Sequence, residues 1–190
     1  MSARDEPGAE RGSLARARPN LTAPRLRPWQ PWAALAGFAF LLHFVWEILQ
    51  VRAYAEMPSV RHWDAIRTCT VATLGDVVLM LVSYAVVAAA ARETRWLRRL
   101  TMPRVAGLLV TGLVISVVFE LVNTRVLDRW QYAPGVPTLA GMGINVWLQW
   151  LLLPPLTLWL SRRHLGIGDS HTSLSPLGPA VRRSDTEITL

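Results

Sequence analysis

The chain has 190 residues, of which 52% are hydrophobic, and its formal net charge is +7. This length suits a single domain. All 20 basic residues are arginines, and most of them lie beside apolar runs. We therefore expect the positive charge to face a membrane surface rather than a nucleic acid. The single cysteine, Cys69, excludes an internal disulfide and zinc sites built on several cysteines.

Four apolar runs are each long enough to cross a bilayer, which takes roughly 20 residues. They cover about residues 32–51, 66–91, 105–123 and 139–160. A soluble helical bundle is the alternative, but its helices should have broad charged faces, and these runs have none. We therefore predict an all-α, four-transmembrane-helix bundle over residues 29–162. Disordered tails are expected on both sides of it, over residues 1–28 and 163–190.

The distribution of arginine predicts the orientation of the spans. Six arginines precede the first run, five lie between the second and third runs, and four follow the fourth run. By contrast, residues 53–65 contain only Arg61, and in the third connection Arg129 stands beside Asp128. The positive-inside rule then predicts that both termini of this multi-pass protein are cytoplasmic. The lysine-free composition, rich in alanine and arginine, suggests a bacterial source, so we expect the inner membrane of a bacterium. Tryptophans are expected to anchor both interfaces: Trp29, Trp32, Trp96 and Trp159 at the inner one, and Trp63 and Trp130 at the outer one.

Two octets resemble each other without a gap, VWEILQVR at residues 45–52 and VFELVNTR at residues 118–125. Each has an acidic residue, an amide one turn later, and an arginine two residues beyond the amide. The offset of 73 residues contains two spans, so a duplication would give two parallel two-helix repeats. Chance similarity between the ends of two spans is the other interpretation.

The acids and arginines of the two octets lead to a pairing prediction. Within one helix, residues five positions apart point in different directions, so each acid should find its partner on the other octet. We expect Glu47 to pair with Arg125, and Glu120 to pair with Arg52.

Each run carries polar or small side chains on one face, and we expect these stripes to turn inward. A charged residue at the centre of a span costs about 2.5–3.5 kcal/mol, so the acids should be paired, neutral, or in a water-filled cavity that opens outward. The stripes are His43, Glu47 and Gln50; Cys69, Thr73, Asp76, Met80 and Ser83; Gly112, Ser116, Glu120 and Asn123; and Asn145 with Gln149.

Ionisable residues inside a span are functional by default, and paired acids can divide general acid and base roles. We predict as catalytic residues His43, Glu47, Asp76 and Glu120. We predict as substrate-binding residues Gln50, Asn123, Asn145, Gln149, Trp130 and Tyr132. The alternatives are hydrogen bonding between helices for the amides, and interface anchoring for Trp130 and Tyr132.

Two other chemistries have weaker support in the sequence. A single histidine with carboxylates suits a hard or borderline cation, but no second histidine or dense acidic motif accompanies it, so we expect no metal. Ser116, His43 and Asp76 could form a nucleophilic triad, but no nucleophile-elbow spacing is present. No cofactor is expected, because no glycine loop suited to phosphate occurs.

Four motifs are distinctive as a set: HFVWEILQ (43–50), HWDAIRTCTVATLGD (62–76), Glu120 followed by RWQYAP (129–134), and LQWLLLPP (148–155). Together they resemble a family of small bacterial multi-pass membrane proteins, and the resemblance implies no particular activity. There is a fainter similarity to lycopene-cyclase-type membrane domains, but the chain lacks the Glu-Glu pair expected early in the span after the W-x-Y stretch.

The polar site is expected to bind, and to modify by acid/base chemistry, a lipid-like or small amphipathic substrate. A second interpretation is a small proton-coupled transporter that acts as a homodimer, with protonation of Asp76 or Glu47 coupled to movement. A third is a non-catalytic subunit of a larger membrane complex.

Overall fold

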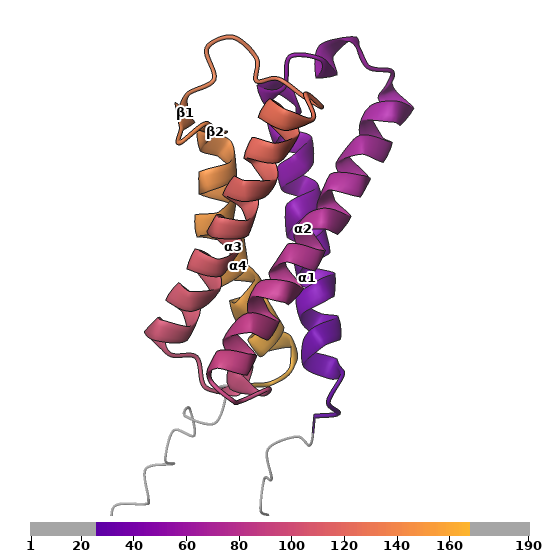
Figure 1. Ribbon diagram of the computed structural model, residues 1–190. Helices are drawn as coiled ribbons and strands as arrows, with labels where there is room; N and C mark the ends of the chain where they lie inside the picture. The colour runs from indigo at the N-terminus through magenta and orange to yellow at the C-terminus, as the bar shows by residue number, and fades with distance from the viewer. Residues whose placement is uncertain (1–25, 168–190) are drawn as a thin grey trace, which may run out of the picture.

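The computed structural model describes residues 26–167, which form an all-α bundle with short connections (Figure 1). The predicted tails, apart from residues 26–28 and 163–167, lie outside the described residues. The last helix runs through His164, past the predicted start of the second tail at residue 163. The four helices are α1 (Gln30–Gln50), α2 (His62–Ala90), α3 (Met102–Leu121) and α4 (Ile144–His164).

The helices form a ring in which α1 contacts α2 and α4, and α3 also contacts α2 and α4. The first turn of α1, the connection 91–101 and the last turn of α4 lie at one end, which we call the terminal end (Figure 1). The connections 51–61 and 122–143 lie at the other end, which we call the loop end. The two octets therefore lie at the loop end, on helices that face each other across the ring.

Three helical segments in the described part of the chain are long and apolar enough to cross a membrane: Gln30–Ala53, His62–Ala90 and Met102–Val126. The α4 helix is not among them, although its outward face is also apolar. The exposed apolar side chains include Leu41, Val45 and Leu49 on α1, Val71, Leu74 and Val78 on α2, Val110, Val114 and Val118 on α3, and Leu148, Leu151 and Leu152 on α4.

The terminal half of the bundle contains the apolar core. Trp96, from a 3-10 turn (Trp96–Arg98) between α2 and α3, is fully buried there. Its ring stacks on Tyr84 at 4.7 Å between centroids, and its Nε1 donates to the Tyr84 carbonyl oxygen at 3.3 Å. The prediction that Trp96 anchors the interface is therefore wrong, because the connection folds back over the helix ends. The same core includes Leu35, Met80, Leu97, Leu108 and Leu158.

The start of the fourth helix was predicted five residues too early. Residues 138–143 instead form a hairpin, in which β1 (Thr138–Leu139) pairs antiparallel with β2 (Met142–Gly143). Ala140 and Gly141, at its turn, have φ values of 54° and 79°, which no right-handed helix can include. The α4 helix begins at Ile144 and continues through Pro154 and Pro155.

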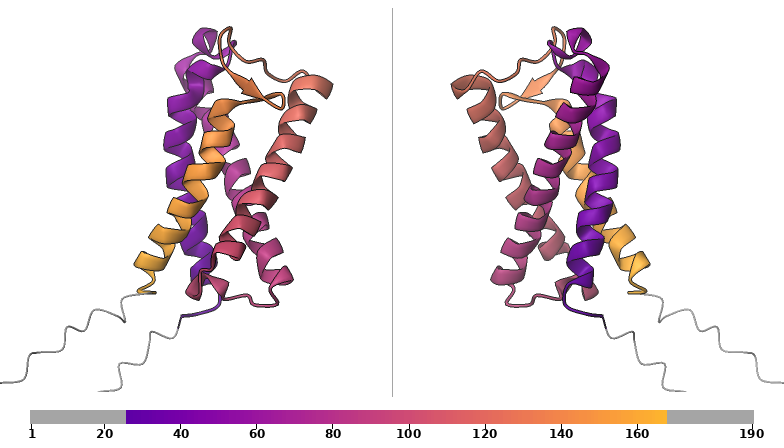
Figure 2. Two further views of the ribbon diagram at one scale, coloured as in Figure 1. Left: turned by 90° about the vertical axis from the view of Figure 1, so that its left-hand side faces the viewer. Right: turned by 90° about the vertical axis from the view of Figure 1, so that its right-hand side faces the viewer.

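The α3 helix meets α4 closely in mid-bundle, because Gly112 lies against Trp150. A Cβ atom at Gly112 would come within 1.9 Å of the Trp150 ring. By contrast, α2 and α3 lie close together at the terminal end and diverge toward the loop end (Figures 1 and 2). The polar side chains described next come from all four helices, between the middle of the bundle and the loop end.

Candidate functional site

A buried group of three side chains joins α1, α2 and α4. Gln149 Nε2 lies 2.8 Å from Asp76 Oδ2 and 2.8 Å from His43 Nδ1, and the Asp76 oxygen is 3.2 Å from the same histidine nitrogen. His43 is fully buried, whereas the Asp76 side chain is 17% exposed. Asp76 is therefore the member of this group that the surroundings of the bundle can reach.

The histidine has one free nitrogen whichever proton arrangement it adopts. Either Nδ1 accepts from the Gln149 amide and Nε2 carries the proton, or Nδ1–H donates to Asp76 and Nε2 has a lone pair. Nε2 is buried and has no hydrogen-bond partner. A carboxylate and an amide on one nitrogen, with the other nitrogen left open, is an arrangement suited to proton transfer.

A second group lies one turn along α1, toward the loop end. Gln50 Nε2 donates to Glu47 Oε1 at 2.6 Å, and Gln50 Oε1 accepts from Trp46 Nε1 at 2.9 Å and from Asn145 Nδ2 at 2.8 Å. The Gln50 amide is therefore fixed in one orientation, with its NH₂ group toward the acid. Glu47 is buried, and its carboxyl group lies within electrostatic range of the Asp76 carboxyl group.

Glu120, near the end of α3, is held by the connection that follows it. Trp130 Nε1 donates to Glu120 Oε1 at 3.0 Å, and the Tyr132 hydroxyl donates to the same oxygen. Glu120 is only 6% exposed. Trp130 and Tyr132 thus bind the Glu120 carboxyl group, in addition to lying at the end of the bundle where the outer membrane interface was expected.

The two loop-end connections form a cap over these groups. Tyr54 and Tyr132 form an antiparallel bridge, and their rings stack at 5.7 Å between centroids. Ala133 N donates to the Ala53 carbonyl oxygen at 2.9 Å, and Ala55 N donates to the Gln131 carbonyl oxygen at 3.0 Å. The cap therefore ties the segment after α1 to the segment after α3.

Electrostatics keep the two cap tyrosines protonated. Burial, followed by the nearby Glu47 carboxylate, raises the pKa of Tyr54 well above its usual value near 10. Burial and the hydrogen bond to Glu120 raise the pKa of Tyr132 in the same direction. Both hydroxyl groups therefore remain donors over the whole physiological pH range.

The predicted cross-pairing of acids and arginines is wrong. Salt bridges among the described residues join His43 with Asp76, Arg61 with Asp64, and Arg104 with Glu93, and none includes Arg52 or Arg125. Both of these arginines are exposed. The Arg125 guanidinium instead lies against Gly141 of the hairpin, 2.7 Å from where a Cβ atom would be. The hydrogen bonds to the Glu47 and Glu120 carboxyl groups come from neutral donors and not from arginines.

The remaining predicted residues are placed less centrally. Asn123 is buried in a π-helical turn (Val122–Val126), where Nδ2 donates to the Phe119 carbonyl oxygen at 2.7 Å and Oδ1 has no partner. Ser116 Oγ also has no partner, so it is not hydrogen-bonded to His43 as a nucleophilic triad requires. Within residues 26–167, no group of three or more His, Cys, Asp or Glu side chains is arranged to hold a metal ion.

Sequence reasoning missed two residues of the site, Trp46 and Tyr54. Trp46 lies four residues before Gln50, so the one-turn spacing was a usable signal. Tyr54 has no such signal, because its contacts with Tyr132 depend on how the two connections meet.

No protein-family model matches this chain, and neither a curated protein nor a solved structure matches it. The function must therefore be inferred from the polar groups themselves.

Proposed function

We propose that the chain is a four-span integral membrane protein that binds a lipid-like or small amphipathic molecule at its loop-end polar groups and changes it by acid/base chemistry. The observation that carries this proposal is the buried, unpartnered Nε2 of His43. A buried polar atom without a partner is unfavourable unless a ligand or water completes it. A substrate atom at this nitrogen would complete it.

The neighbours of His43 support proton transfer in particular. Asp76 and Gln149 fix the ring, so the free nitrogen has a defined direction. The Glu47 carboxyl group lies within electrostatic range of the Asp76 carboxyl group, which is 3.2 Å from the histidine ring. His43 would then serve as the base, and the acid pair would serve as the proton reservoir.

The exterior of the bundle favours a substrate that arrives from the membrane. All four helices expose aliphatic side chains, and α2 and α3 diverge toward the loop end (Figure 2). Asp76, on α2, is the partly exposed member of the histidine group. An amphipathic molecule could thus place its polar part near Asp76 while its apolar part stays among lipids.

The test compares lipids in cells and lipids bound to the purified protein. We expect His43→Gln and Glu47→Gln to alter the cellular lipid profile relative to wild type, because each removes a group that exchanges protons while preserving side-chain size. His62→Gln is the matched control, since His62 is exposed at the start of α2. Identical lipid profiles and identical bound molecules for all four proteins would refute the proposal.

A second candidate function is a proton-coupled carrier, acting as a dimer. The observation that favours it is a set of buried hydroxyl groups without partners, which continues from the polar groups toward the terminal end: Ser83, Thr157 and Ser161. Water molecules that complete these hydroxyls would form a path for protons. A carrier should give pH-dependent flux in liposomes that Asp76→Asn abolishes, whereas an enzyme of the first kind should give none.

A further inference from the structure

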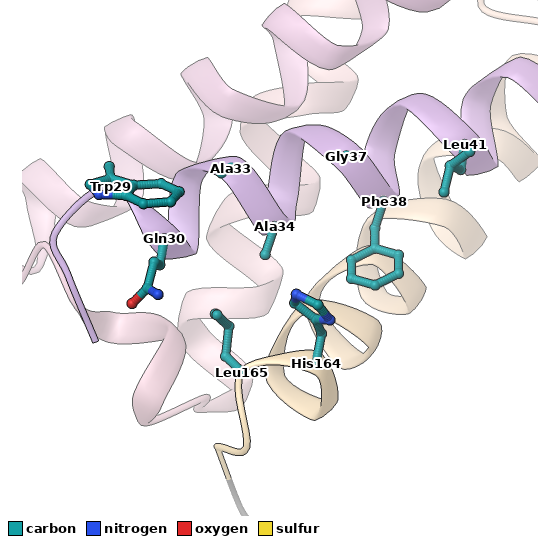
Figure 3. Close-up of a pocket in the computed structure, with 9 residues that line it drawn as sticks. All are labelled: Trp29, Gln30, Ala33, Ala34, Gly37, Phe38, Leu41, His164 and Leu165. Carbon is teal, nitrogen blue, oxygen red and sulfur yellow. The ribbon is translucent and has the colours of Figure 1, made fainter. Parts of the chain in front are cut away.

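A groove lies between α1 and α4 at the terminal end, far from the polar groups (Figure 3). It encloses about 360 Å³ and is open on one side. Its floor follows small residues of α1, and its wall is formed where the Phe38 ring meets the His164 ring at 5.7 Å between centroids. The lining residues are Trp29, Gln30, Ala33, Ala34, Gly37, Phe38, Leu41, His164 and Leu165.

The floor of the groove is apolar and unfilled. Gly37 is exposed, and a Cβ atom built on it would have no neighbour within 4 Å. Phe38 and Leu41 continue the apolar surface along α1, away from the terminal end. In a bilayer, such a groove on the outer surface of the bundle would be filled by a hydrocarbon chain.

The mouth of the groove is polar and lies at the arginine-rich end of the bundle. His164 and Gln30 line it, and the Arg27 backbone N–H donates to Gln30 Oε1 at 2.6 Å. Arg163 follows next to His164 in the sequence, and its guanidinium lies over the Trp159 ring, 5.7 Å from the centroid. Glu93 is the one acidic residue within residues 26–34, 88–106 and 160–167, and Arg104 already neutralises it at 2.6 Å. The arginines of the same segments are Arg27, Arg92, Arg95, Arg98, Arg99, Arg104, Arg162 and Arg163.

We propose that this groove is a binding site for an anionic glycerophospholipid, with one acyl chain along Gly37 and the headgroup phosphate near His164 and Arg163. The charge of the mouth selects an anionic headgroup over a zwitterionic one, as basic pockets between membrane helices do. The site is separate from the polar groups at the loop end, so its failure would leave the proposed acid/base function untouched.

The test measures which lipids stay bound when the full chain, in detergent, is mixed with equal amounts of phosphatidylglycerol and phosphatidylcholine. Native mass spectrometry counts the bound lipids and also reports the oligomeric state. We expect wild type to retain phosphatidylglycerol preferentially. Gly37→Leu should remove this retention by filling the groove, and Gly75→Leu is its matched control, since Gly75 also has open space around it, on α2.

A second variant tests the headgroup contact without touching the groove floor. Arg163→Gln should reduce the preference for phosphatidylglycerol by about five-fold, as expected for one cation at an anionic headgroup. Arg61→Gln, exposed at the loop end, should leave the preference unchanged.

Three results would overturn the proposal. The first is equal retention of the two lipids by wild type. The second is unchanged lipid retention by Gly37→Leu. The third is a wild-type dimer that Gly37→Leu converts to a monomer without a change in bound lipid, because the groove would then hold a second copy through its small residues, Ala33 and Gly37.

Discussion

His43 Nδ1 and Asp76 Oδ2 come from different helices and lie 3.2 Å apart inside the bundle. The histidine is completely buried, and the acid is partly open to its surroundings. The pair is therefore a side-chain link between α1 and α2.

A double-mutant cycle should detect this link. Asp76→Asn, His43→Gln and their combination should give a coupling free energy of about 1 kcal/mol, within the range measured for hydrogen bonds between membrane helices. Unfolding in mixed micelles supplies the free energies. The control cycle combines His43→Gln with Glu93→Gln at the terminal end, where the effects should add. Additive effects in the His43–Asp76 cycle as well would contradict the observed contact.

Gly112 should tolerate no side chain while Trp150 is present. Gly112→Ala brings a Cβ atom within 1.9 Å of the Trp150 ring, so α3 and α4 must separate. We expect a loss of about 1–3 kcal/mol of unfolding free energy, as for other overpacked cores. Gly75→Ala, with open space around it, should be neutral or slightly stabilising. Adding Trp150→Leu should restore part of the loss; no restoration would show that the clash is not the cause.

Tyr132 should hold the cap against Glu120. Tyr132→Phe removes one donor to this buried acid while preserving the ring stack with Tyr54, and we expect it to cost about 1 kcal/mol. Limited proteolysis should then cut residues 127–137 faster than in wild type. Arg129→Gln, on the same connection but with an exposed side chain, should be cut at the wild-type rate. Equal rates for the Tyr132 variant would mean that Trp130, the ring stack and the backbone hydrogen bonds to residues 53–55 secure the cap without the hydroxyl group.

The cap tyrosines predict a loss of stability in alkali. Their folded pKa values lie above the unfolded value near 10, so the folded chain keeps protons that the unfolded chain releases. Their contribution to stability is thus fully present below about pH 10 and falls as the pH rises above it. Unfolding free energies measured across this range should decline less steeply for Tyr54→Phe than for wild type. An equal slope in both proteins would mean that Tyr54 ionises normally.

Labelling of single introduced cysteines should place the two ends of the bundle on opposite sides of the membrane. Arg61→Cys lies at the loop end and Arg95→Cys at the terminal end, and both positions are exposed. An impermeant thiol reagent applied to intact spheroplasts should label the first and reach the second only after permeabilisation. Native Cys69 is buried and serves as the unreactive background. Labelling of both sites from outside would contradict a bundle that crosses the membrane.

Helical periodicity in the sequence was sufficient to predict which side chains face inward. His43, Glu47 and Gln50 follow one face of a long apolar run, and all three are buried. Such an argument succeeds because the direction of a side chain within one helix depends only on spacing. The helices themselves were located from hydrophobic runs for the same reason, although α4 began five residues later than predicted.

The partners of those side chains could not be predicted in the same way. Arg125 has the opposite charge to Glu47, but its position past the end of α3 directs it to the hairpin, whose shape depends on the positive φ of Ala140 and Gly141. Trp96 likewise joins the core only because a short connection folds back on Tyr84. Contacts made by connections depend on the assembled bundle, whereas position near the end of an apolar run was the only basis for predicting an interface role for Trp96.

The two similar octets end in different kinds of helical turn, and this difference changes which side chains α3 presents to the interior. The first octet ends in a tight 3-10 turn (Val51–Ala53), whereas the second widens into the π turn (Val122–Val126), closed by Leu127 N donating to the Val122 carbonyl oxygen at 2.9 Å. A π turn contains one residue more than the α-helical ladder needs. Returning that residue to the ladder would rotate Asn123 by about 100° relative to Glu120, the angle of one helical step. The π turn therefore sets the direction in which α3 presents Asn123 relative to Glu120.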